Sequence, residues 1–167
     1  MKAKQEDFLK ILSSYQGIIH KVNLIYFKST IDREDNFQEV VYQLWRSFPK
    51  LNDKSKIGSW IYAVAINTSI SKIRKDVHFI VTDSATISHE EQDDDGDDDD
   101  EIEYDVNYNN LVEALRKLNE IDKSIMLLYM EGKSYNDISS ILGISISNVG
   151  VRINRAKKEL KRKLNNI

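Results

Sequence analysis

Apolar residues in the C-terminal part of the chain recur at intervals of three and four, which places them on one side of an α-helix. The clearest stripe consists of Ile146, Val149, Ile153, Ala156, Leu160 and Leu164. Ser145 is suited to cap this helix, and Gly143 to end a preceding helix whose Ser134 and Asp137 resemble a capping box. Because the connection is so short, the pattern predicts a helix-turn-helix.

The opposite side of the second helix carries hydroxyls, amides and positive charges. Its residues are Ser147, Asn148, Val151, Asn154, Arg155, Lys158 and Arg162, with Arg152 on the flank. Such a mixture can form hydrogen bonds in a DNA groove, although solvated charged faces are also common on helices. Val151 favours DNA, because an apolar side chain amid polar ones needs a partner and a thymine methyl would be one.

Five further periodic segments predict the rest of the fold. Three lie in the N-terminal part: residues 7–26; a helix capped by Asp32 and ended by Pro49; and residues 57–74. The core positions are Phe8, Ile11, Leu12, Tyr15, Ile18, Ile19 and Val22 in the first, Phe37, Val40, Val41, Leu44, Trp45 and Phe48 in the second, and Ile57, Ile61, Val64, Ala65 and Thr68 in the third. Residues 107–118, and a helix from the cap Asn119 to Gly132, supply two more. Since no segment shows strand alternation, we expect an all-α fold with three N-terminal and four C-terminal helices.

Two other helix faces offer candidate chemistry. The exposed side of the second helix includes Asp35, Gln38, Glu39 and Tyr42, which alone indicate only a solvated surface. On the third helix, Trp60, Asn67 and Arg74 recur at seven-residue steps. These three could stack on and hydrogen-bond unpaired nucleotides, or Trp60 could simply belong to the core.

Charge is distributed very unevenly along the 167 residues, although the net charge is only -3. Residues 90–105 hold twelve carboxylates, so the rest of the chain has 15 acidic against 24 basic residues. A basic protein with an acidic insert suits a nucleic-acid partner. Self-repulsion should keep the acidic segment extended and disordered, which predicts two small helical domains, 1–77 and 107–167, joined by a flexible linker, 78–106.

Several function classes are excluded by what the sequence lacks. With no cysteine there is no disulfide, thiol nucleophile or zinc module. The three histidines are scattered and no phosphate loop or nucleophile motif occurs, so we expect neither an enzyme nor a cofactor or metal site. Asp93, Asp95 and Gly96 have EF-hand register, but Ile102 stands where the glutamate is required. The longest apolar run, residues 60–66, is too short to span a membrane and no signal peptide is apparent, so we expect a cytoplasmic protein.

Two long blocks resemble one known family. REDNFQEVVYQLWRSFPKL followed by IGSWIYAVAINTSISKIRK is similar to the sigma-two domain of extracytoplasmic-function (ECF) sigma factors of bacterial RNA polymerase. LLYMEGKSYNDISSILGISISNVGVRINRAKKEL is similar to their sigma-four domain. The resemblance implies a promoter-recognition subunit that binds core RNA polymerase and promoter DNA, and leaves open whether an anti-sigma protein holds it inactive.

The resemblance also implies roles for individual residues. Asp35, Gln38, Glu39 and Tyr42 match the docking surface for core polymerase, and Lys56, Trp60, Asn67 and Arg74 match the segment that engages the opened minus-ten element. The helix with Ser147, Asn148, Val151, Arg152, Arg155 and Lys158 matches the one that reads the minus-thirty-five element, within which Val149 and Ala156 should be structural. Gly150 and Val151 depart from the family pattern, and Gly150 would cost helix stability while letting the backbone approach a phosphate.

Three roles stay open for the acidic linker: it could imitate nucleic acid, shield the basic helix in the free protein, or act as a plain spacer. Two rival functions also stay open. One is a helix-turn-helix regulator that does not occupy the sigma site, and the other is an interaction protein whose acidic segment is the active part.

Overall fold

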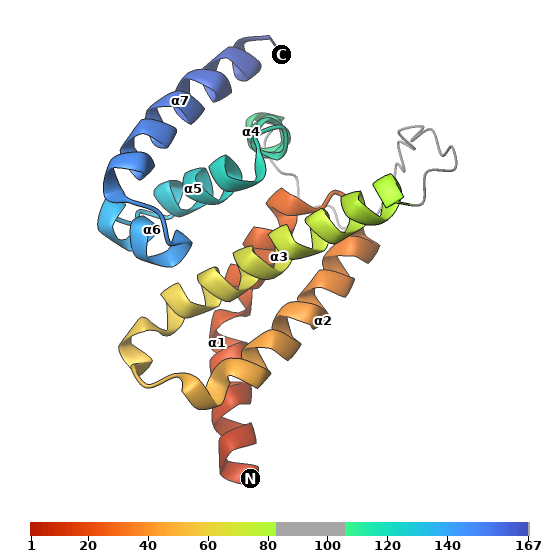
Figure 1. Ribbon diagram of the computed structural model, residues 1–167, viewed down its shortest axis with the longest axis vertical. Helices are drawn as coiled ribbons and strands as arrows, with labels where there is room; N and C mark the ends of the chain where they lie inside the picture. The colour runs from red at the N-terminus through yellow and green to blue at the C-terminus, as the bar shows by residue number, and fades with distance from the viewer. Residues whose placement is uncertain (83–105, 167) are drawn as a thin grey trace.

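Seven α-helices and no strand make up the described part of the chain, which is residues 1–82 and 106–166 with the side chains of 78–82 excepted, in a computed structural model (Figure 1). The N-terminal three are α1 (Lys2–Tyr26), α2 (Thr30–Ser47) and α3 (Ile57–Thr82). The C-terminal four are α4 (Val106–Arg116), α5 (Glu120–Met130), α6 (Tyr135–Leu142) and α7 (Ile146–Asn165). Two 3-10 turns, η1 (Phe48–Lys50) and η2 (Lys54–Lys56), connect α2 to α3. The predicted all-α fold and helix count are confirmed.

The predicted caps of the C-terminal helices are confirmed. Asn119, Ser134 and Ser145 each accept a hydrogen bond from the backbone N–H three residues on, at 2.9, 3.1 and 3.1 Å. Gly143 ends α6 with a φ of 67°, in the left-handed region that glycine adopts at little cost. The helix-turn-helix is therefore specified by local side-chain chemistry.

Three predicted boundaries in the N-terminal part were wrong. Helix α1 begins at Lys2 rather than at residue 7. The cap of α2 is Ser29, whose hydroxyl accepts from the Asp32 N–H at 3.1 Å, so Asp32 is the third residue of the helix rather than its cap. Helix α3 continues to Thr82, past Arg74 and into the expected linker. Residues 75–82 contain no glycine or proline to end a helix, whereas the linker had been placed by its weak apolar periodicity and its acidic run. Residues 83–105, with the acidic run, lie outside the described part.

Helices α1, α2 and α3 pack together around an apolar centre (Figure 1). Its fully buried members include Ile19, Val22, Val40, Leu44, Ile61, Ala65 and Ile66. Tyr15 and Trp45, predicted as core, are 38% and 37% exposed. Trp45 still covers Phe8, with ring centroids 5.1 Å apart. Their helices thus place these two aromatic rings at the edge of the packed face.

A buried polar cluster ties these three helices to one another. The Asn36 amide nitrogen donates to Asn23 Oδ1 at 2.6 Å and to Ser69 Oγ at 2.9 Å, and all three side chains are buried. Asn23 donates in turn to the Arg33 carbonyl at 3.0 Å. Periodicity did not reveal this cluster, because an asparagine on a core face is recognisable only when its partners from other helices are known.

We expect Asn36→Ala to lower the free energy of unfolding by about 1–3 kcal/mol, because it leaves the buried Asn23 oxygen without its donor. Urea denaturation would measure the change. Gln16→Ala, on the exposed side of α1, is the matched control and should stay within about 0.5 kcal/mol of wild type. Equal stability of Asn36→Ala and wild type would show that the cluster contributes nothing.

The C-terminal helices pack around the predicted stripe of α7, with two exceptions. Val149, Ile153, Ala156 and Leu160 are buried, together with Ile125, Leu128 and Ile138 from α5 and α6. Ile146 and Leu164, at the ends of the stripe, are 50% and 37% exposed. They lie at the two ends of α7, where the neighbouring helices give less cover. Burial of Val149 and Ala156 agrees with their expected structural role.

The two groups of helices are packed against each other rather than held apart. Helix α1 contacts α4 and α5, and α3 contacts α6. Buried residues from both groups form one continuous apolar cluster. The sequence had predicted two domains with a flexible connection, and gave no indication of this contact.

Candidate nucleic-acid interface

The outward side of α7 is exposed along its whole length. Ser147, Val151, Arg155 and Lys158 are all exposed, whereas Asn148 and Arg152 are half-buried on the flank. Val151 is 62% exposed and touches no core cluster. The predicted groove-facing row is thus available to a ligand, with an unpartnered apolar group at its centre.

A carboxylate that the sequence did not single out lies beneath this row. Asp122, the third residue of α5, is buried, and its Oδ1 accepts from Arg152 Nη1 at 2.9 Å. Its Oδ2 lies 3.5 Å from Arg155 Nη2. The Asn119 cap marks Asp122 as a capping partner in the sequence, but its contact with two arginines thirty residues later depends on tertiary packing.

Gly150 does not face outward. A Cβ at this position would meet the ring of Tyr135, on α6, at 3.5 Å, which is an ordinary van der Waals distance. The missing side chain therefore lies against the first helix of the helix-turn-helix. The expectation that Gly150 brings the backbone close to a phosphate has no support in this geometry.

The predicted minus-ten residues form a line along α3 rather than a compact cluster. Lys56, in η2 directly before α3, and Asn67 and Arg74, within α3, are exposed, and the step from Trp60 to Arg74 corresponds to about 21 Å of helix. Trp60 is half-buried, with its ring centroid 6.4 Å from that of Phe48. Trp60 was predicted either to belong to the core or to stack on nucleotides. One part of its ring packs on the core and another part is accessible, so its position is compatible with both.

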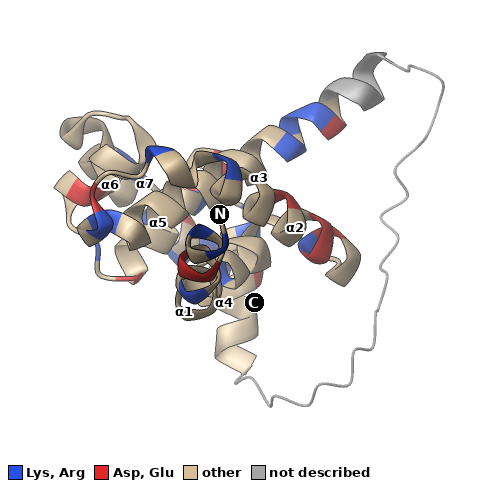
Figure 2. Cartoon of the chain, turned by 90° about the horizontal axis from the view of Figure 1, so that it is seen from below, with Lys and Arg blue, Asp and Glu red and all other residues tan. Residues whose placement is uncertain are grey.

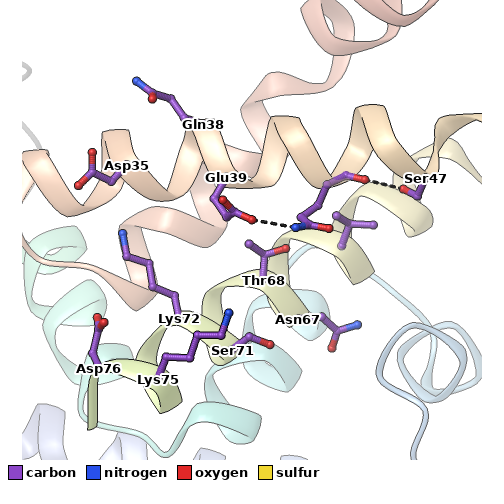
Figure 3. Close-up of a pocket in the computed structure, with 12 residues that line it drawn as sticks. Asp35, Gln38, Glu39, Ser47, Asn67, Thr68, Ser71, Lys72, Lys75 and Asp76 are labelled. Atoms are coloured by element: carbon purple, nitrogen blue, oxygen red, sulfur yellow. Dashed lines mark hydrogen bonds between the residues drawn. The ribbon is translucent and has the colours of Figure 1, made fainter. Parts of the chain in front are cut away.

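A groove between α2 and α3 brings two of the predicted sites together (Figure 3). It has a volume of about 870 Å³, and Asp35, Gln38 and Glu39 line one wall while Asn67 lines the other. Lys72 and Lys75 also line the α3 wall, and the sequence analysis had not singled them out. The α3 wall thus carries two lysines together with Asp76, opposite the two carboxylates of α2. Figure 2 shows blue and red side by side toward the C-terminal end of α3, and mainly red along α2.

Tyr42 lies on a different side of α2. It is 56% exposed and borders an almost wholly apolar groove of about 380 Å³ between α1 and α2. Phe8, Leu12, Phe37, Gln38, Val41 and Trp45 complete the lining. Gln38 borders both grooves, so the four predicted docking residues form one continuous exposed surface of α2.

Two pKa shifts near these surfaces each arise from hydrogen bonds to neighbouring groups. Hydrogen bonds from the Ser55 hydroxyl and N–H lower the pKa of Asp53, at the start of η2. On α7, the hydrogen bond of 2.7 Å to the Tyr129 hydroxyl raises the pKa of Lys157.

Residues 1–82 and 106–166 contain no group of His, Asp or Glu that could hold a metal ion, and no helix among them is apolar and long enough to cross a membrane.

Comparison with protein families gives two matches that follow the same order as the two groups of helices. Residues 11–78 match the sigma-70 region 2 family, and residues 108–160 match sigma-70 region 4. The chain belongs to the ECF group of sigma-70 factors. The matched ranges include the predicted docking residues of α2, most of α3 and most of the helix-turn-helix.

Relatives of this ECF sigma factor are similar along most of its length. It is 26% identical to RNA polymerase sigma factor YlaC of Bacillus subtilis over 132 residues, 78% of this chain and 76% of the relative. Against the ECF sigma factor SigW of the same organism, identity is 23% over 99% of this chain and 93% of SigW.

Two solved structures share the fold. Sigma factor RpoE of Bartonella quintana, solved in complex with the anti-sigma factor NepR, superposes with a TM-score of 0.72 at 20% identity, covering 99% of this chain and 98% of RpoE. CnrH, solved with the cytosolic domain of CnrY, gives a TM-score of 0.65 at 14% identity, with 97% and 90% covered.

Polar contacts join the two regions of this sigma factor. Lys21 of α1 forms an ion pair of 2.8 Å with Glu131, and Tyr62 of α3 donates to the same carboxylate at 3.3 Å. The Arg74 guanidinium, part of the predicted minus-ten row, lies 3.3 Å from a Glu120 carboxylate oxygen. Burial raises the pKa of the Tyr62 phenol, and the negative charge of Glu131 acts in the same direction.

Two further hydrogen bonds cross the same boundary. The Tyr26 hydroxyl donates to the Glu120 carbonyl at 2.5 Å, and Arg116 Nε donates to the Leu24 carbonyl at 2.9 Å. Burial also raises the pKa of Tyr26. Because the contacts use backbone carbonyls as well as side chains, they fix region 4 against region 2 in one closed arrangement.

Proposed function

We propose that this ECF sigma factor directs RNA polymerase to promoters through three surfaces, two of which meet in the groove between α2 and α3. The exposed face of α2 docks on core polymerase, the row along α3 captures the opened minus-ten strand, and the outward side of α7 holds the duplex at the minus-thirty-five element. In this role the protein forms no covalent bond, needs no cofactor and works beside polymerase in the cytoplasm.

The observation that carries the proposal is the exposure of Val151 in the middle of the α7 row. A single exposed apolar side chain is common on protein surfaces, but within a row of polar and positive groups it can contact a thymine methyl in a major groove. The neighbouring Arg155 and Lys158 would supply contacts to bases or phosphates. A solvated structural helix would not require this combination.

The α3 row supports the minus-ten assignment. The accessible part of Trp60 can stack on an unpaired base. Asn67, on the α3 wall of the groove, offers an amide donor and acceptor to a base further along the strand. Lys72 and Lys75 extend the positive charge of the row beyond Lys56 and Arg74. We therefore add both lysines to the proposed path of the single strand.

Docking on polymerase is assigned to Asp35, Gln38, Glu39 and Tyr42 because they are exposed together on α2. Within the described chain, the side chains of Asp35 and Gln38 have no hydrogen-bond or ion-pair partner, which leaves them free to contact a basic, polar surface. We also propose an anti-sigma protein as a third partner, since RpoE, which shares the fold, was crystallised with the anti-sigma factor NepR.

Run-off transcription with purified core polymerase on randomised promoter DNA tests the proposed function. We expect the chain to convert core enzyme into one that initiates at a defined pair of sequence elements. A regulator that does not occupy the sigma site would bind DNA without enabling core polymerase to initiate. An interaction protein acting through its acidic segment would keep its activity after removal of residues 107–167.

We expect Val151→Glu to reduce transcription from the selected promoters at least tenfold, on the order of 1.4 kcal/mol or more, because a carboxylate would face phosphates at the groove edge. The same run-off assay measures it. Val106→Glu is a matched control, since Val106 is 72% exposed at the first position of α4, outside the row. Equal activity of the two variants would remove α7 from the proposed interface.

A further inference from the structure

Asp122 is a buried carboxylate with three side-chain partners on two helices. Its side chain is 1% exposed. One partner is local, because the Asn119 amide nitrogen donates to Oδ2 at 2.6 Å. The other two, Arg152 and Arg155, come from α7 at 2.9 and 3.5 Å.

Stability alone does not explain an ion pair in this position. Removing a carboxylate from water is costly, and well-packed apolar residues of similar volume usually stabilise a fold at least as well as a buried ion pair. The helix start requires only the contact with Asn119. What a carboxylate provides and an apolar side chain cannot is a fixed orientation for the guanidinium groups that it contacts.

Both arginines are held in a way that suits recognition. Arg152 Nη1 binds Asp122 while its Nε lies 3.3 Å from Asn148 Oδ1, so the guanidinium is fixed at two edges. Arg155 is tethered at one nitrogen only and its side chain remains 58% exposed, beside Val151 and Lys158. A flexible side chain that is already oriented loses less entropy on binding DNA.

We infer that Asp122 is a positioning residue for promoter reading: it fixes the guanidinium groups of Arg152 and Arg155, so base discrimination upstream depends on a side chain that cannot touch DNA. The inference rests on the proposed function of α7. It also implies that Arg152 contacts DNA with the edge of its guanidinium that does not face Asp122, and only in the orientation that the ion pair with Asp122 imposes.

Asp122→Asn in the full chain bound to core polymerase is the direct test, because it removes the charge and nearly preserves the shape. We expect discrimination between the preferred minus-thirty-five sequence and single-base variants to fall about tenfold. Binding of the variant to random-sequence duplex should strengthen, and its slope against salt should steepen by about one, since the released guanidinium groups can neutralise phosphates. A purely structural role would instead weaken binding to every sequence.

Asp137→Asn is the matched control. Asp137 is likewise the third residue of its helix, with its N–H bonded to the Ser134 cap, but it is exposed and has no arginine partner. The same loss of charge there should strengthen binding to all sequences alike and leave discrimination unchanged. A loss of discrimination in Asp137→Asn equal to that in Asp122→Asn would contradict the inference.

If Asp122→Asn fails to fold, Asp122→Leu with Arg152→Met removes the whole buried pair and leaves no isolated charge. That double variant should fold and lose more discrimination than Arg152→Met alone, because Arg155 is then no longer tethered. Wild-type discrimination in a folded variant of either kind would overturn the inference. If wild-type holoenzyme itself has no upstream preference, the proposed function of α7 fails and the inference fails with it.

Discussion

Reversing two charges on α2, Asp35→Lys with Glu39→Lys, should reduce the affinity for core RNA polymerase by more than about a hundredfold, since each like-charge contact at an interface costs several kcal/mol. Both carboxylates are exposed on the wall of the α2–α3 groove. The fold should be nearly unaffected, because Glu39 makes only a surface hydrogen bond of 2.8 Å with Gln43. Fluorescence anisotropy of the labelled chain, titrated with core polymerase, measures the affinity.

The control for this prediction is a second pair of exposed carboxylates. Glu6→Lys with Asp7→Lys, near the start of α1, changes the net charge by the same amount away from the groove. It should bind polymerase with nearly wild-type affinity. Equal weakening of both variants would mean that net charge alone governs the association, and the specific docking surface would have to be abandoned. The difference should narrow as salt rises, because exposed charges are screened.

Local sequence signals predicted the helix-turn-helix well, because its determinants are close together in the chain. Ser134, Gly143 and Ser145 act through the backbone within one turn of a helix end. The same logic explains the error at α2, where Ser29 and Asp32 are both good caps and only the geometry shows that the hydroxyl accepts the bond. Capping patterns therefore locate a helix start to within one turn.

Tertiary features were predicted less well, for two reasons. Periodicity finds which face of a helix is apolar but not how far its neighbours extend, so Ile146 and Leu164 were wrongly assigned to the core. Buried polar groups are recognisable only with their partners, which is why Asn36 and Asp122 were missed. Packing of region 4 on region 2 was missed as well, since the surfaces that meet there are mixed in polarity.

The closed arrangement of the two regions conflicts with simultaneous use of both proposed DNA-reading rows. Helix α6 contacts α3 on one side and α7 on the other, so the axes of α3 and α7 approach to within roughly 20 Å, two helix-packing distances. The minus-ten and minus-thirty-five elements are separated by roughly 25 base pairs, or about 85 Å of duplex at 3.4 Å per pair. Region 4 must therefore leave region 2 before both elements can be bound.

Locking the closed arrangement should consequently abolish promoter-directed transcription. Since the chain has no cysteine, Lys21→Cys with Glu131→Cys introduces two unique thiols at an ion pair of 2.8 Å that joins the regions. Joining them with a short bis-maleimide that contains a disulfide in its spacer prevents separation. We expect run-off transcription to fall to the level of core polymerase alone.

Reduction of the spacer provides an internal control, because it releases the lock and leaves every other modification in place. Activity should then return to that of the double-cysteine variant before treatment. Each single-cysteine variant, treated with the same reagent, should stay active.

Without reagent, loss of the Lys21–Glu131 ion pair and the Tyr62 hydrogen bond removes two contacts that favour closure. The untreated variant should therefore be at least as active as wild type. Full transcription by the cross-linked protein would show that the regions need not separate, and would overturn the assignment of the two rows to two distant elements.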